Sequence, residues 1–161
     1  MTHEPRLTTE LRGLLQSHRV ASLGTHNSDG TPFVSMVPFA IDANGRVAIH
    51  ISGLAAHTRN LQASPQVSLL VMQAEVPGEP VHALHRVTLQ GTASPLQRDT
   101  EEWARARSAY LARFPEAEPM TQLGDFCFVA IEISAAIQVA GFGAARTLDA
   151  QAVQQALLPP A

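Results

Sequence analysis

The stretch that decides the fold spans residues 46–73 and reads RVAIHISGLAAHTRNLQASPQVSLLVMQ. Residues 46–52 alternate between apolar and other side chains, which is the period of a half-buried strand. Residues 54–61 repeat their apolar positions at the spacing of one helical face, and Ser64-Pro65 ends that pattern. Residues 67–72 resume as an apolar strand. The stretch therefore predicts a strand, a short helix and a second strand.

The junction between the first strand and the helix is the most informative part of this stretch. Ser52-Gly53 is a pair that favours a helix start, and the helix that follows carries His57 and Thr58 on its apolar face, with Asn60 one turn beyond. Such a junction gathers free backbone N–H groups and the positive end of the helix dipole at one point. It therefore predicts a seat for a phosphate, and the alternative is an ordinary crossover with a solvated helix cap.

The composition is that of one soluble globular domain. A chain of 161 residues is long enough to bury a full core, and 45% apolar with 16% charged residues is an ordinary balance. The formal net charge of -3 and the lack of a basic run argue against nucleic acid or an anionic membrane surface as a partner. All 11 basic residues are arginine, so lysine Schiff-base chemistry and a P-loop are excluded.

Cysteine usage and the N-terminus bear on the compartment. The single Cys127 cannot form an internal disulfide and lies in an apolar strand-like run, which indicates a buried structural thiol. The first residues are polar and show no signal-peptide core, and no apolar stretch is long enough to span a bilayer. We therefore expect a cytoplasmic protein without a membrane partner.

The N-terminal part of the chain predicts a helix and a hairpin. Thr8 or Thr9 can cap the helix, and residues 27–30 form a strong hairpin turn between two strands. The second of these strands, residues 32–42, is apolar on both faces, and its Pro38 predicts a bulge or an edge. A strand that is apolar on both faces indicates a barrel wall that a partner surface covers.

The rest of the chain adds strands over residues 85–91 and 126–137, a helix over residues 98–114 and a short helix from Asp149. The strands are joined mainly by hairpins, which favours an antiparallel barrel over a doubly wound sheet. The sequence therefore predicts a mainly β protein with flanking helices, built on a six-stranded antiparallel barrel.

Three familiar patterns fail. Residues 141–146 begin like a dinucleotide fingerprint, but Arg146 stands where the third glycine belongs and no strand follows. His82 and His85 have the spacing of metal ligands, but no carboxylate or cysteine lies near enough in sequence, and we predict no metal site. Nothing marks a Gly-x-Ser-x-Gly elbow or a Ser-His-Asp arrangement, so no catalytic acid or base is assigned.

One set of side chains survives and would face a common region if the barrel closes. It consists of Ser35, Ser52-Gly53, the helix face with His57, Thr58 and Asn60, and Arg86. Hydroxyls, an imidazole, a guanidinium and a helix N-terminus together suit a phosphomonoester attached to a flat, partly apolar ligand. Each residue also has a structural alternative, since Thr58 could pack, Arg86 could form an intersubunit ion pair and Asn60 could cap its own helix.

These motifs resemble a known family. Residues 52–70, SGLAAHTRNLQASPQVSLL, and residues 86–93, RVTLQGTA, are similar to the pyridoxamine 5'-phosphate oxidase-like FMN-binding split barrels. Gly141-Phe142-Gly143 adds a similarity to their heme-utilisation subgroup. The resemblance covers about residues 8–148, so we expect a single domain over residues 1–161 with that core.

The resemblance implies a homodimer with FMN at the subunit interface. By position, Ser35, Met36 and Val37 match the strand that runs along the isoalloxazine ring. Ser52, His57, Thr58 and Asn60 match the phosphate-binding turn and helix, and Arg86 matches a position that reaches the flavin from the next strand. The expected function is that of an FMN-binding flavoprotein, an oxidoreductase for a small-molecule substrate that the sequence does not identify.

Two departures from the family pattern keep alternatives open. The C-terminal Arg-x-His element that binds pyridoxal phosphate is replaced by residues 145–148, Ala-Arg-Thr-Leu, which argues against vitamin B6 oxidation. No histidine follows His85, although heme-utilisation members place a heme-ligating histidine in their C-terminal part. The alternatives are a heme-binding or heme-utilisation protein, in which His50, His57, His82 or His85 replaces that ligand, and a non-enzymatic flavin-binding module.

Overall fold

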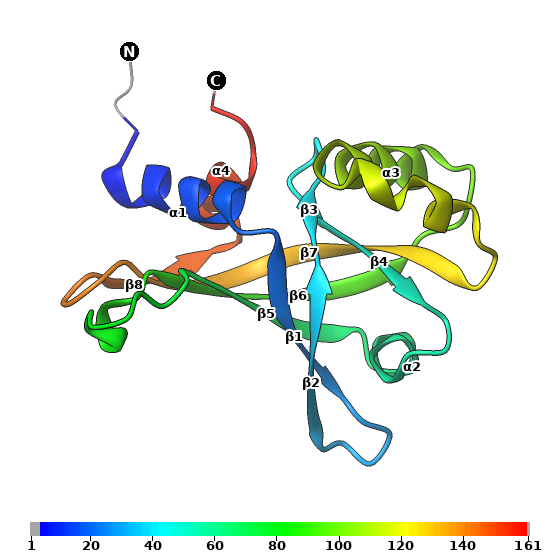
Figure 1. The fold of residues 1–161 in the computed structure, drawn as a ribbon, viewed down its shortest axis with the longest axis horizontal. Helices are drawn as coiled ribbons and strands as arrows, with labels where there is room; N and C mark the ends of the chain where they lie inside the picture. Colours follow the sequence, from blue (N-terminus) through cyan, green and yellow to red (C-terminus); the bar gives the residue numbers. More distant parts are fainter. Residues whose placement is uncertain (1–3, 161) are drawn as a thin grey trace.

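The computed structural model of this chain describes residues 4–160. The chain forms strands with helices between and around them (Figure 1). In order they are α1 (Arg6–Ser17), β1 (Val20–His26), β2 (Pro32–Pro38), β3 (Ala40–Ile41), β4 (Val47–Ser52), α2 (Ala56–Ala63), β5 (Gln66–Met72), η1 (Val81–Ala83), β6 (Arg86–Pro95), α3 (Glu101–Arg113), η2 (Pro115–Gln122), β7 (Phe126–Val139), β8 (Ala145–Asp149) and α4 (Ala150–Leu157).

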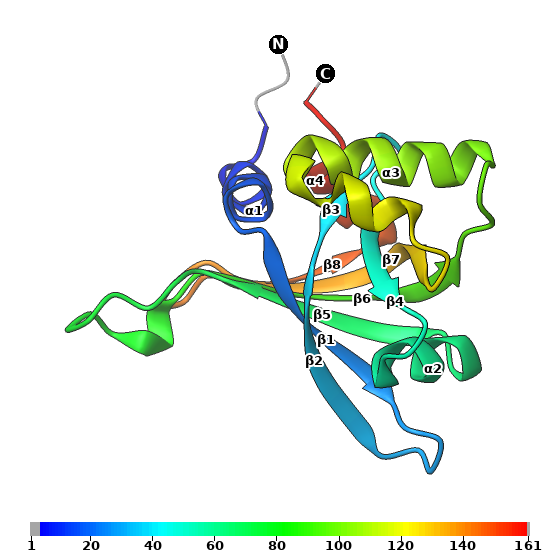
Figure 2. The ribbon, with the colours of Figure 1, turned by 45° about the vertical axis from the view of Figure 1, so that its right-hand side comes forward.

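All strands belong to one antiparallel sheet in the order β2-β1-β5-β6-β7-β4-β3, and β8 pairs with the second half of β7. β2 and β3 stand at opposite ends of this order, yet only Phe39 separates them in the chain. The sheet must therefore curl until its two ends lie side by side (Figure 2). Phe39, which links β2 to β3, is fully buried where the two ends of the sheet meet. In the described residues, no ladder of hydrogen bonds pairs β2 with β3 or β4, so the curled sheet stays split between β2 and β4.

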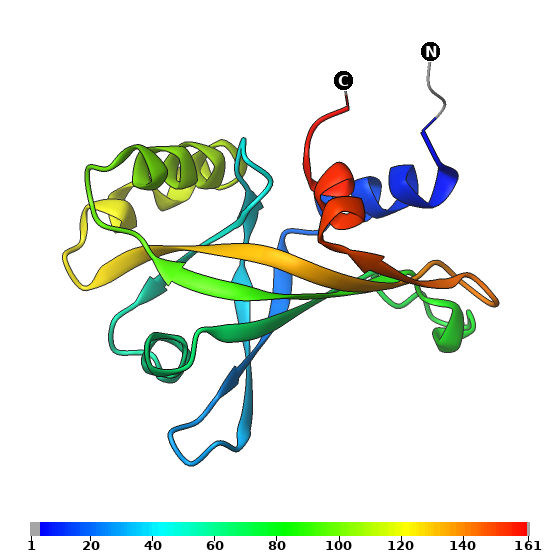
Figure 3. The same ribbon diagram turned by 180° about the vertical axis from the view of Figure 1, so that it is seen from behind.

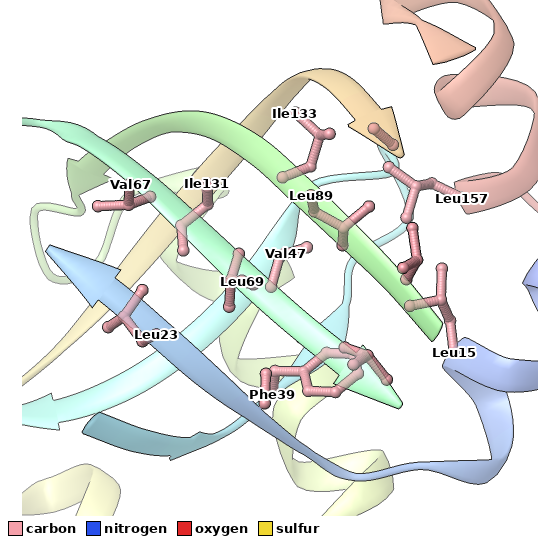
Figure 4. Packing of buried hydrophobic residues seen from close by; sticks show 14 of the residues in the cluster. Leu15, Leu23, Phe39, Val47, Val67, Leu69, Leu89, Ile131, Ile133 and Leu157 are labelled. Atoms are coloured by element: carbon pink, nitrogen blue, oxygen red, sulfur yellow. The ribbon is translucent and has the colours of Figure 1, made fainter. Parts of the chain in front are cut away.

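The interior of the curl holds the main core, to which α1 and α4 add their apolar faces. Figure 4 shows Leu23, Leu69, Leu89 and Ile131, from four different strands, pointing toward one another. A second, smaller core lies between β4, β7 and α3, where Tyr110 and Phe128 pack edge to face. These two cores fix α1 and α4 over one part of the sheet and α3 over another (Figure 3).

On the opposite face of β2, β1, β5, β6 and β7, no helix of residues 4–160 buries the side chains. One row across it joins Met36, Ser22, Leu70, Thr88 and Ile137, each directly opposite the next. Every member of this row is at least partly exposed, whereas the neighbouring row, which includes Leu23, Leu69 and Leu89, is buried. The sheet therefore has one dry face and one open face that is itself largely apolar.

Two expectations about the elements are corrected. The sheet has eight strands and not six, because the predicted strand over residues 32–42 divides into β2 and β3 and because residues after Gly143 form β8. Pro38 was predicted to mark a bulge or an edge, and it is the last residue of β2, which is an edge strand. Helix α1 begins at Arg6 with Pro5 as its N-cap, and the predicted cap Thr8 is buried within the helix. Within residues 4–160, no helix combines the length and apolar character needed to cross a membrane.

Candidate functional site

The candidate site lies at the split in the sheet, where β2 faces α2. The Ser35 hydroxyl on β2 lies 2.9 Å from Nδ1 of His57 on α2, a hydrogen bond between residues 22 positions apart. Both residues were predicted for the site from the sequence, and the structure brings them together. Neither is fully buried, so the pair is accessible at the split.

Strand β2 presents Ser35 to the split because it is an edge strand that pairs with β1 alone. Ser35 lies opposite the buried Leu23, so its side chain shares the inner face of the sheet. Val37 also lies on this face and is 2% exposed, which places its side chain in the core. Met36 points to the open face and is 64% exposed. The three residues expected to line one ring therefore point in two directions.

Helix α2 is tied to the end of β4 by Thr58, whose hydroxyl donates to the carbonyl of Ser52. Thr58 is fully buried, so its role in this chain is to anchor the helix. The predicted helix start at Ser52-Gly53 is corrected: α2 begins at Ala56, and the Ser52 hydroxyl accepts a hydrogen bond from the Leu54 N–H in the turn before it. The Ser52 side chain is thus already engaged by the backbone.

His57 is half-buried, and this burial lowers the pKa of its imidazole below the ordinary value. The ring is therefore neutral near pH 7. In the tautomer that carries its proton on Nδ1, that proton is donated to the Ser35 hydroxyl and Nε2 keeps its lone pair. Among the residues that the structure describes, no protein group forms a hydrogen bond with Nε2.

Asn60 lies on α2 one turn after His57 and is only 9% exposed. Its Nδ2 donates to Thr25 Oγ1 at 3.0 Å and to Asn27 Oδ1 at 3.1 Å, so it connects α2 to the β1–β2 hairpin. The alternative that Asn60 caps its own helix is not what the structure shows. Thr25 and Asn27 were not predicted, because nothing in their local pattern signals a contact 33 or more positions away.

Arg86 lies far from this site within one chain. It pairs with Met72 and Val139 at the last residues of β5 and β7, whereas Ser52 pairs with Phe126 at the first residue of β7. Its guanidinium donates to the carbonyls of Leu84 and His82 at 2.9 and 3.3 Å. The structure therefore assembles Ser35, Ser52, His57, Thr58 and Asn60 around the split and places Arg86 at the opposite end of the sheet.

The other candidate histidines differ sharply from His57. His50 is 6% exposed and packs against the rings of Tyr110, Phe126 and Phe128, and burial lowers its pKa to about 4. His85 has its Nε2 3.2 Å from the side-chain amide nitrogen of Gln138, which must donate to it. His82 is exposed on η1, at the end of the sheet away from the split. Only His57 combines access at the split with a held ring and an unused nitrogen.

The fold and these motifs define the class of protein. The sequence matches the pyridoxamine 5'-phosphate oxidase family over residues 7–140, and the chain belongs to this family. The family resemblance predicted from residues 52–70 and 86–93 is thereby confirmed.

Three relatives within this class carry heme in their names. The heme oxygenase HutZ of Vibrio cholerae is 33% identical over 87% of this chain and 80% of its own length. Its crystal structure, described as that of a heme storage protein, superimposes with a TM-score of 0.72 over 79% of this chain and 89% of that chain, at 32% identity.

The chloroplastic heme oxygenase HOZ of Arabidopsis thaliana is 37% identical to this chain. The similarity covers 84% of this chain but only 41% of HOZ. A heme-binding protein of Mycobacterium smegmatis superimposes with a TM-score of 0.84 and 27% identity over 95% of this chain and 62% of that structure. This chain is thus shorter than two of the proteins it resembles.

These relatives correct the functional expectation. The main interpretation from the sequence, an FMN-dependent oxidoreductase, is wrong, because the relatives are heme oxygenases and heme-binding proteins. The heme alternative is the interpretation that they support. The geometry agrees with the correction, since Arg86 does not join the other predicted phosphate ligands within one chain.

Proposed function

We propose that this protein binds heme at the split between β2 and α2, with Nε2 of His57 as the ligand to iron. The observation that carries the proposal is the hydrogen bond between Ser35 Oγ and His57 Nδ1, which holds the ring and leaves Nε2 free. The heme-binding and heme-degrading relatives support the ligand class.

The chemistry of the Ser35–His57 pair suits a metal ligand. A histidine that binds a metal nearly always donates its other ring N–H to a neighbouring oxygen, which fixes the tautomer and the ring orientation. The lowered pKa of His57 keeps its imidazole neutral, which is the state that coordinates iron. Phe33 lies on the same face of β2 two residues before Ser35, and Leu54, which is 78% exposed, lies just before α2. These side chains offer apolar surface to a porphyrin.

The same chain is proposed to form a homodimer through the open face of its sheet. Val34, Met36 and Ile137 on this face are 67%, 64% and 48% exposed. Leu70 lies between Met36 and Ile137 in the same row, with Ser22 and Thr88 as the polar members. Exposed apolar side chains gathered on one sheet face favour an interaction site over a solvated face. A second copy of the chain, packed on this face, would cover it, and strand β2 would then be shared between the interface and the heme site.

Titration of the heme-free protein with hemin tests the heme proposal. A Soret band with the shift of an imidazole complex is expected for the unchanged protein and for His85→Ala. His57→Ala should lose more than the roughly ten-fold in affinity that removal of an outer-shell partner of a ligand costs. Equal binding by His57→Ala would contradict the assignment. Adding ascorbate in air to the heme complex distinguishes heme degradation from heme storage. An oxygenase would bleach the Soret band and release iron, whereas a storage protein would keep the Soret band.

Sedimentation of the heme-free protein tests the dimer. The unchanged chain and the control Met120→Glu, altered at an exposed methionine on η2, are expected to sediment as dimers. Met36→Glu places an unpaired charge on the open face and is expected to sediment as a monomer. A monomeric unchanged chain, or a Met36→Glu dimer, would contradict the proposal.

A further inference from the structure

The β1–β2 hairpin extends away from the rest of the sheet, and α2 lies alongside it (Figures 1 and 2). The tip of this hairpin is stiff. The Asn27 backbone N–H donates to the Thr31 carbonyl, and the Asn27 and Thr31 side chains are hydrogen-bonded at 3.1 Å. Asp29 in turn accepts from the Thr31 backbone and hydroxyl. The tip therefore moves as a unit, and its position relative to α2 depends on contacts between the two.

Few such contacts exist near the tip, because a cleft of about 840 Å³ separates it from α2. The cleft is lined on one side by His26 and residues 27–30 and on the other by Arg59, Ala63 and their neighbours. Asn60 stands at its margin and spans it with both amide protons, to Thr25 Oγ1 and Asn27 Oδ1. The side chain thus joins two elements where packing does not.

The partners of Asn60 lie close to the proposed site. Thr25 is directly opposite Phe33, two residues before Ser35 on β2, and Asn60 lies one helical turn after His57. Asn60 therefore joins α2, which carries His57, to the hairpin whose second strand carries Ser35. A shift of the hairpin away from α2 would lengthen the Ser35–His57 hydrogen bond.

We propose that Asn60 is a positioning residue, which sets the separation between β2 and α2 and thereby holds the Ser35–His57 hydrogen bond in place. This inference rests on the proposed function for its meaning in heme binding, but the geometry that it concerns exists without heme. It gives Asn60 a role different from the contact with a cofactor that its position in the family motif implied.

The chemistry requires an amide at position 60. The Asn27 side chain donates its own amide nitrogen to Thr31 Oγ1, so the oxygen of that side chain faces Asn60 and needs a donor. Thr25 Oγ1 accepts the second proton of the Asn60 amide. An aspartate at position 60 would set an acceptor against Asn27 Oδ1 and would break this contact with almost no change in side-chain volume.

The test is ¹⁵N NMR of the imidazoles in heme-free protein at a pH where His57 is neutral, followed by hemin titration of the same samples. In the unchanged protein and in the control Gln62→Asp, on an exposed position of the same helix, the His57 shifts should report a single Nδ1–H tautomer. Asn60→Asp should show a mixture of tautomers and a loss of about ten-fold in hemin affinity.

Unchanged His57 shifts in folded Asn60→Asp would overturn the inference, whether or not heme binds. If Asn60→Asp alters the His57 shifts but the unchanged protein takes up no hemin, the positioning role stands and the proposed function is overturned. If Asn60→Asp does not fold, Asn27→Ala removes one of the two partners at an exposed turn and should produce the same change in smaller degree, and unchanged shifts there would also overturn the inference.

Discussion

The two ends of the sheet each hold a half-buried histidine that is hydrogen-bonded to a neutral side chain, but the two networks end differently. At the split, His57 is held through Nδ1 by Ser35 and the network stops there, with Nε2 unused. At the far end, beside η1 and β8, His85 is held through Nε2 by Gln138. One histidine keeps a free coordinating nitrogen and the other has lost it.

Arg146 explains why the far network is closed. Its Nε donates to Gln138 Oε1 at 2.8 Å, and a guanidinium can only donate, so the orientation of the Gln138 amide is fixed. The Gln138 nitrogen then donates to the Leu7 carbonyl at 2.9 Å and faces His85 Nε2, which must accept. Gln138 is fully buried and ties α1, β6, β7 and β8 together. The partners of these two histidines, rather than their burial, therefore determine which ring nitrogen stays without a hydrogen bond.

The largest effect is expected from breaking the closed network with Gln138→Leu. This change leaves the Leu7 carbonyl, His85 and Arg146 without their shared partner in a buried place and should cost about 3 kcal/mol of unfolding free energy. Urea denaturation measures this loss, with exposed Gln97→Leu as the control. The hemin affinity of Gln138→Leu should stay unchanged as long as the protein is folded. A folded Gln138→Leu that binds hemin more weakly would contradict the proposal that only the His57 end of the sheet binds heme.

A smaller effect concerns His50. Its Nδ1 is buried and has no hydrogen-bond partner in the described chain. Its pKa falls from 6.5 in the unfolded chain to about 4 in the fold. The unfolded state therefore binds more protons below pH 6.5, and stability is lost as the pH falls toward 4.

Between pH 7 and 5, this histidine should remove about 2 kcal/mol of unfolding free energy. His50→Phe, which keeps an aromatic ring among Tyr110, Phe126 and Phe128, should flatten that part of the pH dependence in urea denaturation. An equally steep dependence in His50→Phe would show that other groups carry it.

The smallest effect is expected for Ser35→Ala, which removes only the oxygen that holds His57 Nδ1. Loss of such a partner of a metal ligand weakens metal affinity by roughly ten-fold. Hemin titration should therefore show intermediate binding, weaker than in the unchanged protein and tighter than in His57→Ala. If Ser35→Ala binds hemin as tightly as the unchanged protein, the Ser35–His57 hydrogen bond does not strengthen the binding of iron by His57.

Much of this fold follows from local patterns. The alternation in residues 46–52 and the turn at residues 27–30 predict their strands and hairpin correctly. The division between β2 and β3 was less visible, because Phe39 continues the apolar pattern of a strand while closing the curl. Strand β8 was missed because its sequence, residues 145–149, has too few apolar side chains to show a period.

The site was predictable only in part. Ser35 and His57 were predicted as members of a set that would face a common region if the barrel closes, but their contact depends on how far the sheet curls, which no local pattern encodes. Arg86 was placed with them on the expectation that the closed barrel brings its strand to the same region, whereas the length of β6 and β7 carries it to the other end. The expected FMN function failed for a similar reason, since hydroxyls, an imidazole and a helix start fit several ligands.

The central claim is that His57 Nε2 binds the iron of heme, and resonance Raman spectroscopy of the ferrous heme complex tests it most directly. The unchanged protein should show an iron–histidine stretching band, which His57→Gly should lose and added imidazole should restore in that variant. An iron–histidine band that persists in His57→Gly without imidazole would contradict the claim, because the ligand would then be another residue.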